Sequence, residues 1–529
     1  MSRDLFPKLG IKCDLLQYRC HTLSFISSVA LLIVREAYVM AATISSINMN
    51  KIQRHNVGNI DMISDLPEGI LLHILSFLPT KDAVRTSILA NKWRHLWTYL
   101  TVFHFRTGLD ESHHHNPKNT ANSLLDLVGR LLHKSNHVER LGVRILETKV
   151  DTEKVSSLVS SAAKHRLQYL ELSLGDQSDK FMLPHSFSAF ESLNELHLEL
   201  MFTLHIPSGV CFPKLEKLVV LNVTFLNESS VQQLFSGCPV LQELDLYNCY
   251  WKNLNHISVA ISTLRRLEID FDLFSVDYDH DMTLTIDAVN LLSLSCICNP
   301  PIEFIPVNLT SIVDAFIDLG CEDPPNEPYA AQCAFDLLSG VSSVKSLRLY
   351  NNTLECLYHS KDTIHLLPIF HNLTILEVFS GNPENPNEVL MDILQKTPKL
   401  EVLEIPGVVL NYLDGDYLNS VPCCFKSSLS RLCLLNFYGN EYEIQFLTFI
   451  LQNAPYLVEI KIHCSRQLFA DTEKLTNVCN QLEDVGLESC FIKFLHSYYE
   501  DSDCESDSND ESDEDEAANS GILPAAEAL

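Results

Sequence analysis

The segment L-P-E-G-I-L-L-H-I-L-S-F-L-P at positions 66–79 carries two apolar stripes with helical spacing. Ile70, Ile74 and Phe77 form one stripe, and Leu71, Leu75 and Leu78 form the other. Pro67 suits the first turn of a helix, and Pro79 stops the helix from continuing. The combined apolar arc is wider than the ~100° that a surface helix usually turns toward its own core. We therefore expect a short helix that is either buried on all sides or offers part of its arc to another protein.

Two further short helices are predicted after Pro79, so that three helices form one small module. Thr80 is suited to cap the second helix, with Asp82 in its first turn, and Asn91 is suited to cap the third. The third helix holds Trp93, Leu96 and Trp97. A module of this size has a very small core. We therefore expect its surplus Leu, Ile and Trp side chains to face a partner or the following domain.

From Val138 onward, the pattern apolar-x-x-apolar-x-apolar recurs every 21 to 32 residues. Clear copies begin at Leu167, Leu193, Leu215, Leu241, Leu264, Leu373, Leu400 and Leu457, and weaker copies begin at Val138, Leu291, Ile312, Val344, Leu429 and Leu482. Each copy predicts a strand, and the period is typical of leucine-rich repeats, in which one strand and its helical return form a coil. We expect an α/β solenoid with parallel strands on the concave face and irregular helices on the convex face.

Three copies show the predicted return directly. In each of them a predicted helix ends at a proline, and the first leucine of the strand follows two residues later; these prolines are Pro239, Pro398 and Pro455. A proline ends the helix and favours an extended backbone before the strand. The uneven spacing of the copies places the variation in length on the returning side.

These patterns divide the chain into five parts. We expect a leader at 1–60, the three-helix module at 61–105, a loop and connecting helix at 106–136, the solenoid at 137–490, and an acidic disordered tail at 491–529. Between module and solenoid, Thr107 to Thr120 is predicted to be a loop and Ser123 to Lys134 a helix. The leader contains a 12-residue apolar run, Leu23 to Val34, which is too short to span a bilayer. We interpret the leader as dispensable or as a gene-model extension.

The acidic composition limits the classes of partner. The 529-residue chain has a formal net charge of −30, and the stretch Glu500 to Glu516 holds 11 Asp and Glu without any Lys or Arg. This charge argues against a nucleic-acid backbone or an anionic membrane as the principal partner. The 17 cysteines are scattered without a C-x-x-C pair, which favours a reducing compartment, the nucleus or the cytoplasm.

No motif in the sequence indicates intrinsic catalysis, a cofactor or a metal. A Gly-rich phosphate loop, G-x-S-x-G and H-E-x-x-H are all missing. The histidines at 113–115 have no second cluster beside them, and the acidic stretch at 270–281 lacks the Gly and Glu of a calcium loop, so we interpret both as exposed loops. The position of the structural Asn or Cys of leucine-rich repeats is filled by Cys249, Asn352 and Cys490.

The segment DMISDLPEGILLHILSFLPTKDAVRTSILANKWRHLW at 61–97 closely resembles the plant F-box. It departs from the usual motif at Met62, where Arg is common, and at Ala90 and Asn91, where Ser-Lys is frequent. A second segment at 421–462, within an expected FBD-like part at 421–465, resembles the FBD segment that typically closes plant F-box leucine-rich-repeat proteins. The two resemblances together cover about residues 61 to 490.

The resemblance implies a non-catalytic substrate receptor of a SKP–cullin–F-box (SCF) ubiquitin ligase. In this family the F-box docks on a SKP-type adaptor, and through it on cullin and a RING subunit, while the repeats bind a target protein for ubiquitination. Carried over by position, the adaptor-binding residues are Leu66, Pro67, Ile70, Leu71, Leu75, Leu78, Val84 and Trp93. We expect Ile74, Phe77 and Leu96 in the core of the module itself. The alternative function is an interaction scaffold that binds an adaptor without assembling a ligase.

The outward positions of the early strands suggest a target-binding surface, because side chains alternate along a strand. The candidate residues are Tyr169, Glu171, Glu195, His197, Glu199, Glu243, Asp245, Tyr247, Glu268 and Asp270. We hypothesise that a basic segment of the target binds there, the alternative being a merely solvated face. In the tail, an acidic residue follows three positions after each of Ser502, Ser508 and Ser512, which is typical of acidophilic kinase sites.

Overall fold

The structure is a computed structural model. The chain forms two compact units, Met1–Val344 (unit 1) and Lys345–Leu529 (unit 2). The structure describes residues 66–106, 117–146, 150–175, 181–182, 185–201, 203–207, 209–225, 227–251, 256–272, 283–299, 302–320, 327–358, 361–379, 388–406, 420–483 and 490–496. The expected leader, the histidines at 113–115 and the three candidate phosphorylation sites lie outside these residues.

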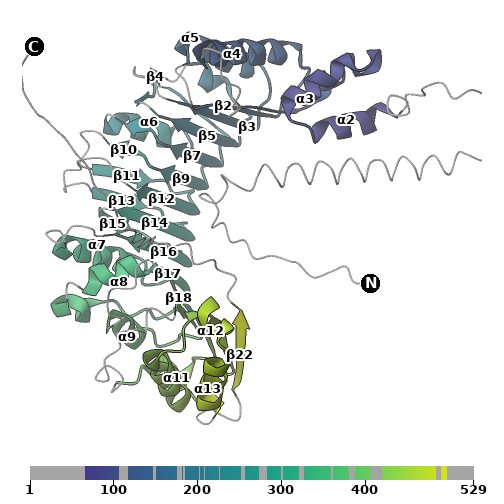
Figure 1. Cartoon of the computed structure of the whole chain (residues 1–529). Coiled ribbons are helices and arrows are strands. Elements are labelled where there is room, and N and C mark those ends of the chain that lie inside the picture. The colour runs from purple at the N-terminus through teal and green to yellow at the C-terminus, as the bar shows by residue number, and fades with distance from the viewer. Residues whose placement is uncertain are drawn as a thin grey trace, which may run out of the picture. The chain divides into compact units, whose positions relative to one another are not determined.

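The predicted three-helix module is present at the start of unit 1 (Figure 1). Its elements are α2 (Glu68–Ser76), α3 (Thr80–Arg85) and the 3₁₀ turns η3 (Thr86–Ile88), η4 (Asn91–Arg94) and η5 (Leu96–Tyr99). The third predicted helix is therefore two separate 3₁₀ turns, divided at His95. Buried side chains of α2 and of the η turns form the core, among them Leu71, Leu96 and Trp97, together with Leu100, which follows η5.

Two predicted helix caps are wrong. Thr80 is the first residue of α3, and Pro79 occupies the N-cap position with an extended backbone. The Thr80 hydroxyl instead accepts a hydrogen bond from the backbone N–H of His104 at 2.9 Å. Ala90 occupies the N-cap position of η4, and Asn91 is the first residue of that turn. We expected the Thr80 hydroxyl to cap the helix. It is instead hydrogen-bonded to His104, a residue of β1 that is distant in the sequence.

Unit 1 continues as a stack of parallel strands in one sheet, ordered β1-β2-β3-β5-β7-β9-β12-β14-β16. Their bounds are β1 Val102–Arg106, β2 Arg140–Ile145, β3 Tyr169–Leu174, β5 Glu195–Leu200, β7 Lys217–Leu221, β9 Glu243–Tyr247, β12 Arg266–Asp272, β14 Ser293–Asn299 and β16 Asp314–Leu319. Every strand of this sheet from β2 to β16 begins two residues after the first apolar position of a predicted copy. The first strand, β1, was not predicted, although V-F-H-F-R alternates apolar and polar residues in the period of a strand.

The returning side of unit 1 is helical in some coils and extended in others (Figure 1). The helical elements are α4 (Pro117–Lys134), α5 (Thr152–Ala162), η6 (His185–Ala189), α6 (Glu228–Ser236) and α7 (Glu327–Gly340). Three consecutive coils return instead through β11 (His256–Ala260), β13 (Thr283–Asp287) and β15 (Glu303–Val307), which pair into a second parallel sheet. These segments alternate buried and exposed residues with period two, so a strand forms where we expected a helix.

Shorter elements complete the returning side of unit 1. Two two-stranded sheets are formed by β4 (Phe181–Met182) with β6 (Leu204–His205) and by β8 (Thr224–Phe225) with β10 (Tyr250–Trp251). The helix α4 begins at Pro117, within the predicted loop at 107–120, because proline is well accommodated in the first helical turn.

Unit 2 has the same organisation, with strands ordered β17-β18-β19-β20-β21-β22 and paired in parallel. The strands are β17 (Ser346–Tyr350), β18 (Ile375–Phe379), β19 (Val402–Pro406), β20 (Arg431–Phe437), β21 (Glu459–Cys464) and β22 (Phe491–His496). The helices are α8 (Asn351–Tyr358), η8 (Lys361–Leu366), α9 (Glu388–Gln395), α10 (Cys423–Ser427), α11 (Glu441–Asn453), α12 (Arg466–Ala470) and α13 (Thr472–Glu483).

The copy predicted at Leu482 is wrong. Leu482 lies in α13, where Val478 and Leu482 are both buried and stand one helical turn apart. The last strand is β22, which pairs with β21 and extends the sheet past the boundary that we expected at residue 490. Leu482 thus belongs to a helical face, because an apolar residue four positions earlier on the same helix packs with it.

A capping box begins α11 within the FBD-like part. The Asn440 side chain accepts from the Glu443 backbone N–H at 2.9 Å, and the Glu443 carboxylate accepts from the N–H groups of Asn440 at 2.9 Å and Tyr438 at 3.1 Å. Glu443 is fully buried. Burial raises the pKa of its carboxyl above the ordinary value, although these backbone hydrogen bonds oppose the shift. The hydrogen-bond donors to this buried carboxyl group are thus main-chain N–H groups of residues close to it in the sequence.

Candidate functional site

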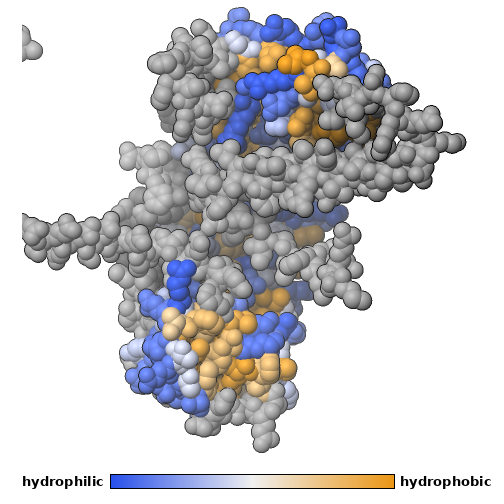
Figure 2. All heavy atoms as spheres, turned by 45° about the vertical axis from the view of Figure 1, so that its right-hand side comes forward, coloured by the Kyte–Doolittle hydropathy of each residue, from blue (hydrophilic) through white to orange (hydrophobic). Residues whose placement is uncertain are grey.

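The apolar stripes of α2 are divided between the core and the surface of the module. Leu71 and Leu75 are fully buried, whereas Ile70 is 48% and Phe77 is 51% exposed. Ile74 is half-buried. The buried stripe packs against η5, because α2 and η5 are neighbours in the module. Figure 2 shows that apolar side chains also reach the surface of the described part of the chain.

This division corrects our assignment of the stripes. Leu71, Leu75 and Trp93 were expected to face an adaptor; all three are buried within the chain itself, and their contact with an adaptor stays a prediction. Phe77 was expected in the core and is exposed, while Leu96 is buried as expected. Of the other predicted adaptor-binding residues, Pro67 and Ile70 are exposed, and Leu66, Leu78 and Val84 are half-buried.

Two exposed apolar residues were missed at the sequence level. Ile88, the last residue of η3, is 85% exposed, and Leu89, which follows it, is 68% exposed. Together with Ile70 and Phe77 they form the set that we call the exposed F-box residues. The sequence could have identified Ile88 and Leu89, because the small core of this module cannot bury a second apolar pair in addition to the apolar stripes of α2.

The module is joined to the first coils of unit 1 by main-chain hydrogen bonds. The N–H of Glu139 donates to the carbonyl of Thr101 at 2.8 Å, and the N–H of Asn136 donates to the carbonyl of Thr98 at 3.3 Å. The Thr80 hydroxyl adds the bond to β1 described above. The sheet therefore begins directly at the end of the module, which fixes the exposed F-box residues relative to the first strands.

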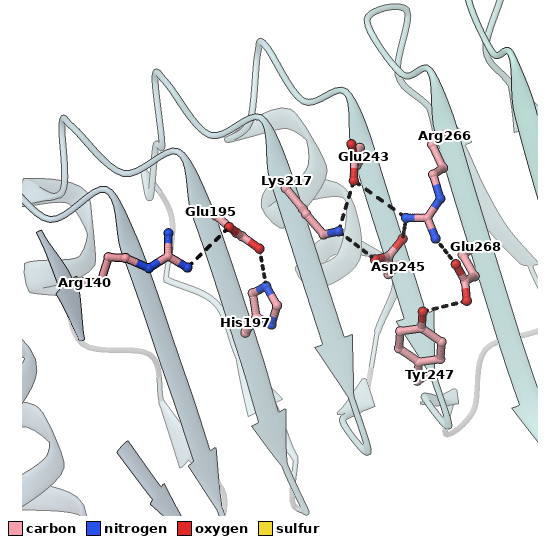
Figure 3. Close-up of polar contacts among 9 residues, drawn as sticks. All are labelled: Arg140, Glu195, His197, Lys217, Glu243, Asp245, Tyr247, Arg266 and Glu268. Carbon is pink, nitrogen blue, oxygen red and sulfur yellow. Dashed lines mark hydrogen bonds and ion pairs between the residues drawn. The ribbon is translucent and has the colours of Figure 1, made fainter. Parts of the chain in front are cut away.

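The second candidate site is the face of the unit 1 sheet opposite the returning elements, which we call the open face. Neighbouring strands pair in register, so their outward side chains form rows across the sheet (Figure 3). One row contains Glu195, Lys217, Glu243 and Arg266, and the next contains Glu171, His197, Val219, Asp245 and Glu268. Acidic and basic groups from different coils thus become neighbours.

Arg266 and Lys217 hold the acidic groups of β9 and β12 together (Figure 3). The Arg266 guanidinium donates to Asp245 at 2.9 Å and also contacts Glu268. The Lys217 ammonium lies 3.0 Å from Glu243 and 3.5 Å from Asp245. Asp245 is only 4% exposed, and burial raises the pKa of its carboxyl although Arg266 and Lys217 favour the charged form.

Further ion pairs lie nearer the F-box. The Arg144 guanidinium donates to Glu199 at 2.7 Å, and Glu199 is 8% exposed. Arg140 stands 4.0 Å from the centre of the Tyr169 ring and 4.0 Å from Glu195. Glu195 in turn lies 2.7 Å from the His197 ring nitrogen.

Most of the acidic residues predicted to bind the target are already neutralised by a base of the chain itself. Five of the seven acidic ones form ion pairs with a base on the same face: Glu195, Glu199, Glu243, Asp245 and Glu268. Of the other two, Glu171 accepts from the Tyr169 hydroxyl at 3.1 Å. Tyr169 is itself largely buried, and the Tyr247 hydroxyl donates to Glu268 at 2.6 Å. The predicted set of outward residues covers β3 to β12 and so lacks Arg140 and Arg144 on β2, although the same alternation identifies both.

Three further sequence features concern metal ligands, membrane spans and cysteines in the described part of the chain. No group of three or more His, Cys, Asp or Glu there is placed to hold a metal ion. Among the described helices, none combines the length and the apolar character needed to cross a membrane. Cys249 is fully buried and donates to the Val220 carbonyl at 3.6 Å, and burial raises the pKa of its thiol to about 12. This thiol therefore stays protonated, in agreement with the structural role expected for it.

Comparison with known proteins identifies the class. The F-box domain matches residues 63–105, the leucine-rich repeats of FBD-associated F-box protein At5g56370 match residues 155–300, and the FBD matches residues 418–462. The class is thus an F-box protein with leucine-rich repeats and an FBD.

Relatives from Arabidopsis thaliana cover most of the chain. F-box/LRR-repeat protein At4g14103 is 31% identical over 379 residues, which is 68% of this chain and 95% of that protein. F-box/LRR-repeat protein At4g14096 is 29% identical over 82% of this chain and 95% of that protein, and FBD-associated F-box protein At1g66310 is 29% identical over 79% and 93%. The chain belongs to the plant F-box/FBD/LRR-repeat family.

Proposed function

We propose that this protein is the substrate-recognition subunit of an SCF-type ubiquitin ligase. The observation that supports the proposal best is the set of exposed F-box residues on a module whose core is already complete. Four large apolar side chains on so small a module leave much apolar area in water, and each fully buried one contributes roughly 1.5–3 kcal/mol to an interface. A SKP-type adaptor that covers this set would bring cullin and a RING subunit to the chain.

The chain acts in this proposal by proximity and not by chemistry of its own. The F-box holds the adaptor, and the open face of unit 1 holds a target protein, so that the ligase meets its target at high effective concentration. The main-chain bonds between Thr101 and Glu139 support this role, because they hold the two surfaces at a defined separation. The reducing compartment expected from the cysteines is the nucleus or the cytoplasm, where such a ligase would work.

The hypothesis of a basic target segment is retained in a narrower form. The bases on the open face neutralise most of its acids, so a basic segment would have to exchange existing ion pairs for its own. Such an exchange has a small net gain at exposed positions and a desolvation cost at buried ones. Charge reversal at Glu243, which is 43% exposed in its side chain, tests the hypothesis with less damage than reversal at Asp245. Unchanged target capture by Glu243→Lys would count against it.

The adaptor surface is tested by substitutions at exposed positions. Ile70→Asp and Ile88→Asp should reduce capture of a purified SKP-type adaptor by at least tenfold while the fold is kept, because Ile70 is 48% and Ile88 is 85% exposed. Leu127→Asp on α4 is a matched control, since Leu127 is also exposed and lies outside the module. Equal loss in the control, or no loss in the two F-box variants, would contradict the proposed surface.

The ligase itself is tested by affinity capture of the full chain from plant cells. Co-purification of adaptor, cullin and RING subunit, all lost together in Ile70→Asp, is the expected result. Capture of the adaptor alone would overturn the ligase proposal in favour of an interaction scaffold. Circular dichroism of each variant should match the unchanged chain, which separates a lost contact from a lost fold.

A further inference from the structure

The strand β22 of unit 2 has one edge without a neighbouring strand. Its residues pair in register with β21, and within the described part of the chain no strand follows on its other side. The N–H of Phe491 donates to the Val458 carbonyl at 2.9 Å, so the main-chain groups of Phe491 point toward β21. Because these groups alternate in direction along a strand, those of Ile492 and Phe494 point to the unpaired edge. This edge thus offers hydrogen-bond donors and acceptors to a further strand.

The apolar core of unit 2 also reaches this edge without being covered. On β21, Ile460 and Ile462 are fully buried. Their register partners on β22, Ile492 and Phe494, face the same side of the sheet and are only half-buried. Figure 2, which turns the side of unit 2 that carries β22 toward the viewer, shows apolar side chains gathered there. The terminal coil of a solenoid needs a cover for its core, so a ligand of this edge should bring apolar side chains.

The first strand of unit 1 shows how this chain closes a sheet edge elsewhere. The N–H of His104 in β1 donates to the Thr80 hydroxyl of α3 at 2.9 Å, and α3 packs against β1. An N–H group bonded to a side chain is not available to a further strand. On β22, no side chain of the described residues is hydrogen-bonded to the main chain of Ile492 or Phe494. The two edge strands therefore differ in their capacity to accept a partner.

The charged side chains near the unpaired edge are mostly basic. On the outward side of β20, β21 and β22 they are three bases and one acid: Arg431, Lys461, Lys493 and Glu459. The Glu459 carboxylate lies 3.1 Å from the Lys493 ammonium and 3.6 Å from that of Lys461, so two bases share one acid. Burial, and then Lys461, lowers the pKa of His463, so its ring adds no charge near pH 7. In a chain with a net charge of −30, this edge favours an acidic ligand.

We propose that the unpaired edge of β22 binds an extended segment of a partner protein in which an acidic residue stands between two bulky apolar residues. The segment adds a strand to the sheet by main-chain hydrogen bonds to Ile492 and Phe494. Its two apolar side chains cover the core side of the same two residues. The acidic side chain between them points to the opposite face and lies beside Lys493. Because the pattern is symmetric, it fits a parallel and an antiparallel strand.

The chain itself does not supply this pattern at the two nearest sources. In a second copy, β22 holds a base, Lys493, and no acid. The acidic stretch Glu500 to Glu516 contains no Val, Ile, Leu or Phe, so it offers acids without apolar neighbours. The inference uses neither the exposed F-box residues nor the open face of unit 1, and it therefore does not rest on the proposed function.

The proposal is tested by peptide binding to the full-length chain, followed by fluorescence anisotropy. The probe is the fluorescein-labelled peptide G-T-V-E-V-T-G. One control peptide, G-T-V-K-V-T-G, reverses the charge, and the other is the probe N-methylated at its three central residues, which removes main-chain donors. The probe should bind at least tenfold more tightly than either control. Equal affinity of the probe and either control peptide would overturn the proposal, whatever the behaviour of protein variants.

A charge exchange locates the site on β22. Lys493→Glu should reverse the preference, so that the lysine peptide binds at least tenfold more tightly than the probe. This variant places a carboxylate opposite Lys461, so an ion pair across the two strands is kept, and circular dichroism will check the fold. Lys426→Glu is the matched control, because Lys426 is exposed and lies on α10. An unchanged preference in Lys493→Glu, or a reversal in the control as well, would contradict the site.

Two further measurements distinguish the partner segment from the chain itself. Sedimentation of the unliganded chain should show a monomer; a dimer that Ile492→Asp dissociates would assign the edge to a second copy and overturn the proposal. In a full-length variant, the acidic residues from Glu500 to Glu527 are changed to Asn or Gln. Unchanged probe affinity is expected, and at least tenfold tighter binding would assign the edge to the tail. Adaptor capture by Lys493→Glu should be unchanged, which keeps this site separate from the ligase proposal.

Discussion

Asp245 in unit 1 and Glu443 in unit 2 are both buried carboxyl groups, but different kinds of donor satisfy them. Asp245 is paired with Arg266 and Lys217, which come from the two neighbouring strands. Glu443 accepts from main-chain N–H groups no more than five residues away. The first arrangement depends on three coils being stacked in register, whereas the second forms within one turn. The burial of Asp245 therefore depends on long-range contacts between coils, whereas the burial of Glu443 depends on a local cap.

The largest expected effect is that of removing the base shared by β9 and β12. Arg266→Met leaves Asp245 buried with one base fewer and should lower the free energy of unfolding of unit 1 by about 3 kcal/mol. Urea unfolding followed by tryptophan fluorescence reports unit 1, because all three tryptophans (Trp93, Trp97 and Trp251) lie in it. Adding Asp245→Leu to Arg266→Met should recover much of the loss; a further loss would argue against an uncompensated charge as the cause.

A smaller effect is expected for the local cap. Glu443→Ala leaves the N–H groups of Tyr438 and Asn440 without their acceptor and should cost about 2 kcal/mol in the local stability of unit 2. Hydrogen exchange of the α11 amides will measure it. Glu441→Ala, at an exposed position in the same first turn, should change exchange far less. Equal effects of the two substitutions would show that the buried carboxyl of Glu443 stabilises α11 no more than the exposed carboxyl of Glu441 does.

The smallest effect is predicted at a carboxyl whose strand partner is also a carboxyl. Glu404 on β19 stands opposite Glu377 on β18. Burial, and then Glu377, raises the pKa of Glu404 above its ordinary 4.5. A raised pKa means that the ionised form is less favoured in the folded state, so its penalty is present near pH 7 and fades as pH falls toward 4.5.

Glu404→Gln should therefore stabilise unit 2 at pH 7 by about 0.5 kcal/mol or less, since the group is partly solvated. At pH 4 the variant and the unchanged chain should be equal. Thermal unfolding at the two pH values will measure the difference, with Glu401→Gln at an exposed position as the control. A stabilisation that is as large at pH 4 as at pH 7 would show that charge is not its origin.

Local patterns carried much of the fold. The first apolar position of each copy from Leu167 to Leu457 precedes an observed strand by two residues, because the repeat pattern encodes both the strand and the turn before it. The capping box of α11 is visible as Asn440 followed by Glu443. The pattern at Leu482 is ambiguous, since Leu482 can be assigned both to a repeat copy and to a helical face, and it lies in α13.

The candidate sites were predicted less completely than the fold. The sequence identifies the F-box segment and its excess of apolar side chains, but it assigned Phe77 to the core and Leu71 to the surface, where the structure has the reverse. Both stripes have the same helical spacing, so nothing within α2 distinguishes them. On the open face, alternation identified the outward residues of β3 to β12, yet not the ion pairs among them.

By itself, the sequence determined the family motifs, the boundaries of most coils and the local caps, because each depends on residues close together along the chain. Only the tertiary structure decided which stripe of α2 is buried and which acids of the open face are neutralised. The partners concerned are far apart in sequence: Arg266 is 21 residues from Asp245, and Arg144 is 55 residues from Glu199. Stacking of the coils brings such groups within 3 Å of each other, and that distance determines whether an acidic row repels a ligand, attracts it or is already paired.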